Sequence, residues 1–165
     1  MTAKKEIFMI LARRAQDMAD RAREGRDDAQ REANSHVGAM ESRYDTFKEE
    51  AQYLAGAQQK RLQEITAAAI KINEITNNDH LMRGEFSRVS IGCLVTVFDE
   101  QRDAEKKMVV SPVLGGEKIQ WGDVEFVVVT PESPIGKLLI GRAIDDEMNV
   151  TIAKRNQTYR ILSID

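Results

Sequence analysis

Two acidic side chains are the first candidates for chemistry in this sequence. Glu41 and Asp45 are four residues apart, so they would share one face of a helix. Their carboxylates together could help to bind a hard cation such as Mg²⁺, whose preferred ligands are oxygen atoms. Carboxylates on a helix surface are more often ordinary solvated charge, so both interpretations of this pair stay open.

Other reactive residue types give weaker signals. His36 lies in a polar stretch, where a solvated turn residue is the simpler interpretation than a metal ligand. Cys93 is the only cysteine, which excludes an intrachain disulfide and argues against a cysteine-based zinc site. The net charge of −3 provides no cationic field for nucleic acid, so we expect any contact with nucleic acid to be indirect or local.

The first half of the chain has the pattern of two long helices. It contains none of the three prolines, and residues 34–38 provide turn residues with a glycine suited to a helix end. Seven-residue spacings in the second arm predict a coiled-coil seam at Tyr44, Ala51, Gln58, Ile65 and Ile72, with companions at Phe47, Leu54, Arg61, Ala68 and Ile75. The first arm repeats this spacing at Phe8, Ala15, Ala22 and Ala29, with Leu11, Met18 and Gly25 as companions.

Folding at this turn predicts an antiparallel hairpin. Leu11 would then lie opposite Leu62, and Met18 opposite Leu54. An arm of about 30 residues would measure roughly 45 Å, because each helical residue rises about 1.5 Å. We expect a monomer, although a seam of this kind can also serve dimerisation.

The second half has the pattern of strands. Apolar alternation predicts strands within 89–98, 106–110 and 124–129 and a closing hairpin from 148 to 164, with a short helix over 135–140. The predicted class is α+β, with a helical hairpin domain at 1–78, its tip near 34–45, and a C-terminal domain at 79–165. Because no segment approaches the ~18 apolar residues of a membrane span, we expect a cytoplasmic protein with no membrane contact.

One segment carries a specific resemblance. The stretch Ser133-Pro134-Ile135-Gly136-Lys137, followed by Leu139-Ile140-Gly141-Arg142, resembles the C-terminal domain of the GreA/GreB family, the bacterial transcript-cleavage factors of RNA polymerase. The resemblance extends back to 91–97, and the N-terminal hairpin agrees with it. It implies an FKBP-like antiparallel sheet with a short helix. This domain would dock at the rim of the polymerase secondary channel, and the hairpin tip would enter the channel.

The resemblance also implies a role for the tip. Family members carry an Asp-x-x-Glu motif there, which helps to hold a Mg²⁺ ion shared with the polymerase active site, and the polymerase itself cleaves the RNA. The protein would therefore be no enzyme alone and have no cofactor of its own. One alignment places Asp45 on the family's Glu and Ser42 on its Asp, with Glu41 one residue away. A shifted alignment nominates Glu49, with Thr46 three residues earlier.

Three functional interpretations follow. The first is a polymerase-binding elongation factor that stimulates RNA cleavage through Glu41 and Asp45. The second is a non-cleaving regulator or inhibitor that occupies the same channel. The third, a prolyl isomerase, ranks last because a domain with so few aromatic residues needs them in its core. The predicted docking residues are Ser133, Pro134, Ile135 and Lys137, whereas Leu138, Leu139 and Ile140 are expected to pack inside.

Overall fold

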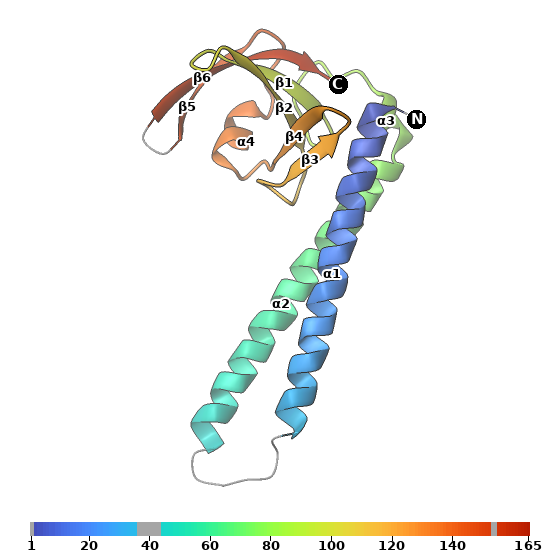
Figure 1. The fold of residues 1–165 in the computed structure, drawn as a ribbon, viewed down its shortest axis with the longest axis vertical. Helices are drawn as coiled ribbons and strands as arrows, with labels where there is room; N and C mark the ends of the chain where they lie inside the picture. The colour runs from blue at the N-terminus through green and yellow to red at the C-terminus, as the bar shows by residue number, and fades with distance from the viewer. Residues whose placement is uncertain (1, 36–43, 153–154) are drawn as a thin grey trace. The chain divides into compact units, whose positions relative to one another are not determined.

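The computed structural model describes the backbone of residues 2–35, 44–152 and 155–165, and within these the side chains of 29, 32–35, 44–52, 152 and 155 are not described. Two long helices, α1 (Ala3–Ser35) and α2 (Tyr44–Asn77), are followed by the short helix α3 (Asp79–Arg83) and a sheet (Figure 1). Contacts divide the chain into two compact units. One is Arg13–Ile70, and the other combines Met1–Ala12 with Lys71–Asp165.

The α1 and α2 helices lie side by side as the two arms of a hairpin within the Arg13–Ile70 unit (Figure 1). Along α2 the buried positions are Leu62, Ala69, Ile72 and Thr76, and the half-buried ones are Ile65, Thr66, Ala68 and Ile75. The predicted series through residues 65 and 72 is therefore correct. Its companion series is correct in part: Ala68 and Ile75 are half-buried and Arg61 is exposed, while the next residues, 62, 69 and 76, are buried more deeply.

The outer part of α2 does not form the predicted seam. Leu54 is 61% exposed and Met18 of α1 is 40% exposed, so the expected burial of these two side chains against each other is wrong. From Tyr53 to Arg61 every side chain of α2 is exposed. This stretch is rich in alanine, glycine and glutamine, which have little apolar surface to bury, so a hydrophobic seam gains little there.

The polar stretch after α2 ends that helix and begins the next one. The Asn78 side chain accepts hydrogen bonds from the backbone N–H groups of His80 and Leu81, both at 3.1 Å. These bonds satisfy donors that have no partner inside α3, as an asparagine N-cap does. None of the helices, over the residues that the structure describes, is both long and apolar enough to cross a membrane.

Six strands form one sheet: β1 (Leu94–Asp99), β2 (Ala104–Val110), β3 (Lys118–Trp121), β4 (Val124–Val129), β5 (Glu147–Ile152) and β6 (Arg155–Ile164). Their order in space is β3-β4-β2-β1-β6-β5. The α+β class is confirmed. Four of the five pairings are antiparallel as expected, whereas β2 and β4 are parallel. In sequence β3 comes between β2 and β4, and in space it lies at the edge of the sheet. The chain therefore reverses direction twice before β4 pairs with β2.

The core of this sheet lies under the helix α4 (Pro134–Leu139). Alternate residues of β1, Val95 and Val97, point into this core, and Leu139 of α4 is fully buried in it. The first strand begins at Leu94, later than the pattern over 89–98 predicts. Residues before it form a turn in which Gly92 adopts a φ of 97°, a conformation that glycine tolerates best.

Candidate functional site

The N-terminus of α4 contains the predicted docking segment, and its cap explains why the helix begins there. The Ser133 Oγ accepts a 3.1 Å hydrogen bond from the Gly136 N–H and donates a 2.7 Å hydrogen bond to the Thr130 carbonyl oxygen. Pro134 follows at the first helical position, where its missing N–H costs nothing. Both hydrogen bonds of the Ser133 hydroxyl are thus made within the chain, where they hold the start of α4 in place.

Gly136 packs α4 tightly against the end of β4. A Cβ atom built on Gly136 would lie 1.8 Å from the Thr130 carbonyl oxygen, a distance that no side chain can adopt. Any larger residue would push the helix away from the sheet. The absence of a side chain at position 136 therefore fixes the position of the whole docking segment.

The exposed groups on α4 differ in part from the prediction. Pro134 and Lys137 face solvent, while Ile135 is half-buried and packs against the core. Leu139 is buried, as expected. Leu138 is half-buried, and the expectation that Ile140 packs inside is wrong, because it is 40% exposed. Ile140 follows the last residue of the short helix and so escapes the buried face.

A cavity of about 660 Å³ opens beside α4, and Ile135 lines it. Its apolar lining includes Met108 and Val127, while Lys106 and Tyr159 provide polar groups. Sequence patterns did not identify this cavity. The sequence signal that could have pointed to it was Lys106, a charged residue just before the apolar end of β2.

A buried ionic network reaches this cavity. Lys106 Nζ lies 2.6 Å from Oδ2 of the fully buried Asp99 and donates a 2.8 Å hydrogen bond to the Tyr159 hydroxyl, which donates in turn to Gln157. Burial opposes the charge of Lys106, but the hydrogen bonds to Asp99 and Tyr159 outweigh burial and raise its pKa. Burial likewise opposes the charge of Asp99, yet Lys106 and backbone N–H groups hold the pKa of this carboxyl below its usual value. Both side chains therefore stay charged at neutral pH.

The acidic candidates at the tip are placed only in part. Glu41 lies outside the described residues. Asp45 and Glu49 belong to α2, but their side chains are outside the described set as well. Over the residues that the structure describes, no cluster of three or more histidine, cysteine, aspartate or glutamate side chains could hold a metal ion. The metal-binding role of Glu41 and Asp45 therefore stays a prediction.

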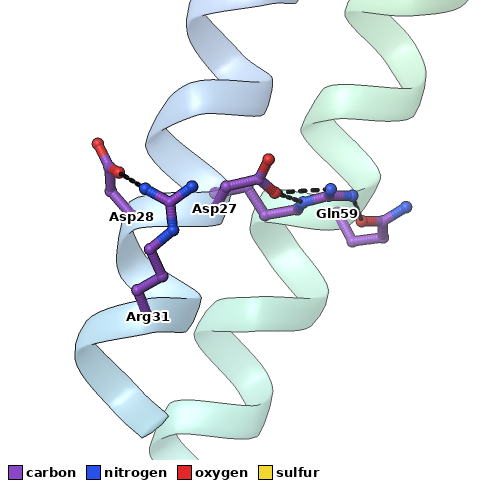
Figure 2. A network of polar contacts seen from close by, with 5 residues as sticks. Asp27, Asp28, Arg31 and Gln59 are labelled. Atoms are coloured by element: carbon purple, nitrogen blue, oxygen red, sulfur yellow. Dashed lines mark hydrogen bonds and ion pairs between the residues drawn. The ribbon is translucent and has the colours of Figure 1, made fainter. Parts of the chain in front are cut away.

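A polar link connects the two arms of the hairpin. The guanidinium of Arg26 donates to Oδ1 of Asp27 at 2.8 and 3.0 Å and to Oε1 of Gln59 on α2 at 3.2 Å. Figure 2 shows Asp27 and Gln59 in this network, with the separate pair of Asp28 and Arg31 beside it. The link lies where α2 has no buried apolar residue. It replaces a hydrophobic seam by hydrogen bonds.

Comparison with known proteins identifies relatives along most of the chain. Residues 84–165 match the family described as "Transcription elongation factor, GreA/GreB, C-term". A transcription elongation factor GreB from Yersinia pestis is 30% identical over 139 residues, which cover 81% of this chain and 72% of the relative. A transcription elongation factor GreA from Psychromonas ingrahamii is 28% identical over 128 residues, covering 72% of each.

Solved structures give a weaker likeness. A crystal structure of the GreA factor homolog 1 (Gfh1) protein of Thermus thermophilus aligns with a TM-score of 0.38 and 15% identity, covering 93% of this chain and 94% of the other.

Proposed function

Because the chain belongs to the GreA/GreB family of transcription elongation factors, we propose that it binds RNA polymerase at the secondary channel and acts on the active centre through its hairpin. The observation that carries this proposal is the 30% identity to a GreB factor, which extends over both the hairpin and the sheet. The protein works as a monomer in the cytoplasm, where polymerase works. It is not an enzyme by itself, because the active site of the polymerase would perform any cleavage of RNA.

Docking uses the surface at the start of α4. Pro134 and Lys137 are exposed there, and Ile140 adds apolar surface at the other end of the helix. A partner helix with apolar and acidic side chains would complement this combination. The cap of Ser133 and the close packing of Gly136 hold these groups rigidly, so little entropy is lost when they bind.

The hairpin supplies the reach. With 33 residues in α1 and about 1.5 Å per residue, each arm is about 50 Å long. An element of this length can carry a tip far from the docked domain. At the tip Glu41 and Asp45, or Glu49 in the alternative alignment, would provide carboxylate ligands to a Mg²⁺ ion shared with the polymerase. Such an ion supplies activation of water.

A non-cleaving regulator that occupies the same channel is the second candidate. The observation in its favour is Ser42, which stands where the family motif has an aspartate in one alignment. The prolyl isomerase interpretation has less support. Among the described residues, Tyr159 is the one aromatic lining the cavity beside α4, and its hydroxyl is engaged by Lys106 and Gln157.

The cleavage test uses backtracked elongation complexes with labelled RNA, Mg²⁺ and the purified full chain. We expect faster RNA shortening, lost in Glu41→Ala or Asp45→Ala and retained in Glu64→Ala, which changes an exposed glutamate of α2. Loss in Glu49→Ala alone would select the alternative alignment. Slowed nucleotide addition without shortening would establish the second candidate, and absence of polymerase binding would overturn both.

The docking surface has a separate test in which binding to core polymerase is measured directly. Lys137→Glu is expected to weaken binding about tenfold or more, because it reverses a charge at the centre of the interface. Glu100→Lys reverses an exposed charge in the turn after β1 and should leave binding within about twofold. Equal affinities for the two variants would contradict docking through α4.

A further inference from the structure

Lys4, in the first turn of α1, is a buried cation. Its side chain is only 6% exposed, and among the described residues no group accepts a hydrogen bond from its Nζ. The Nζ lies 4.2 Å from the centre of the Phe86 ring, over whose face it makes a cation–π contact. The neighbouring Lys5, by contrast, is partly exposed and lies 3.5 Å from the carboxylate of Asp79.

The position of Lys4 is energetically unusual. An ammonium taken out of water without hydrogen bonds loses much of its solvation free energy, and a cation–π contact recovers only a small part of this loss. Burial lowers the pKa of Lys4, and the negative charge of Asp165 offsets this only in part. A site with this deficit gains free energy from any anion that can reach the ammonium.

A cavity of about 500 Å³ adjoins this lysine. It lies within one compact unit, between the first turn of α1, the segment after α3, and the sheet. Leu94, Phe126 and Trp121 form apolar parts of its wall. Its size is in the range of small-molecule sites, which combine apolar walls with a few polar groups that fix the orientation of the ligand.

The charged residues of the cavity favour an anion by a small margin. Besides Lys4, the cations Arg83 and Lys107 line it, against the carboxylates of Glu85 and Asp165. Neither carboxylate accepts a hydrogen bond from Lys4 in the described part of the chain. The four-carbon stem of Lys4 is flexible, so its ammonium can turn from the Phe86 ring toward a bound head group.

We propose that this cavity binds a small amphipathic anion, with a carboxylate or phosphate head paired to the Lys4 ammonium and an apolar body against Trp121 and Phe126. The head group would provide the hydrogen-bond acceptor that the Lys4 ammonium lacks among the described residues, and the apolar body would cover the apolar wall of the cavity. The cavity is lined by none of the predicted tip or docking residues, so the inference goes beyond the polymerase proposal and does not depend on it.

The test titrates the full chain with benzoate and phenyl phosphate as probes, and with benzamide as the neutral counterpart of benzoate. Trp121 is the only tryptophan, so its fluorescence reports occupation of the cavity directly. We expect saturable quenching of the Trp121 fluorescence by at least one anion. The affinity for benzamide should be lower than that for the anion by about tenfold or more. The indole N–H signal in a ¹H–¹⁵N spectrum should shift with the same saturation curve.

Two variants decide whether Lys4 is responsible. Lys4→Met keeps the length of the side chain and removes its charge, so anion affinity should fall about tenfold or more. Lys5→Met is the matched control and should change affinity by less than about twofold. Unfolding curves of both variants serve to check that each variant is folded. Absence of saturable binding of either anion up to about 10 mM, or unchanged affinity in Lys4→Met, would overturn the proposal.

Discussion

The indole Nε1 of Trp121 donates a 2.8 Å hydrogen bond to Oε2 of Glu6, and the two residues are 115 positions apart in the sequence. The bond joins the end of β3 to the first turns of α1. It explains in part why Met1–Ala12 belongs to the same compact unit as the sheet. A domain boundary drawn from composition alone cannot represent a unit made of two separate pieces of chain.

Replacing Glu6 by alanine should lower the free energy of unfolding by about 1–2 kcal/mol, because the indole N–H loses a charged acceptor. The emission of Trp121 should also shift, since its surroundings become more accessible to water. Denaturant unfolding followed by fluorescence measures both effects. Glu24→Ala, at an exposed position of the same helix, is the control and should change stability by less than about 0.5 kcal/mol.

Replacing Lys106 by methionine should lower the free energy of unfolding by about 2–4 kcal/mol, because it removes the cation 2.6 Å from the buried carboxylate of Asp99 and leaves only the exposed Arg102, at 4.0 Å. The double variant Lys106→Met with Asp99→Asn should recover part of this loss, since no buried charge remains. A double-mutant cycle in urea measures the coupling. If the double variant lost as much stability as the two single variants together, or more, an unpaired carboxylate would not be the cause of the loss in Lys106→Met.

The same pair predicts a pH dependence. The folded-state pKa of Asp99 is below its ordinary value of 3.8, so its contribution to stability is present above about pH 4 and is lost as the pH falls through the folded-state pKa. Between pH 5 and about pH 2 the natural chain should therefore lose more stability than Asp99→Asn. Urea unfolding at a series of pH values gives the difference. Parallel pH profiles for the two proteins would contradict the ionic role of Asp99.

Two glycines should respond in opposite ways to alanine. Gly136→Ala would place a methyl group against the Thr130 carbonyl oxygen and should cost about 3 kcal/mol or more, with loss of polymerase docking. Gly25→Ala meets no atom within 4 Å and lies inside α1, so it should raise stability by about 0.5–1 kcal/mol. Thermal unfolding and polymerase binding of both variants measure the contrast. A tolerated Gly136→Ala would show that the start of α4 can move.

Local patterns in the sequence predicted the helices and much of their buried face. The series through Ile65 and Ile72 was correct because both are large apolar residues at heptad spacing. The companion series was correct only in part, because Ala68 and Ile75 are half-buried while Leu62 and Ala69, on nearly the same face, are buried more deeply. In a chain rich in alanine, one position of helical rotation changes the buried area too little to be decided from sequence.

Long-range relationships were less accessible to prediction. The strand over 124–129 was predicted with its observed bounds, because apolar alternation is a local property. Its parallel pairing with β2 was not predicted, since alternation carries no information on the direction of the neighbouring strand. Ser133 and Pro134 were identified by a local motif. The pairing of Lys106 with Asp99 and the burial of Lys4 depend on residues brought together by the fold.

The centre of the sheet has a consequence for the order of folding. There β1 pairs with β6, and Val95 lies opposite Ile164, so a loop of nearly the whole C-terminal domain must close before this pair forms. Closing a long loop lowers the entropy of the chain before the new contacts stabilise it. Strand pairings between residues distant in sequence therefore slow folding. The helical arms need no such closure to begin. On refolding, the far-ultraviolet helix signal should therefore appear before Trp121 is shielded from water, and the protein acquires its hairpin before the domain that anchors it.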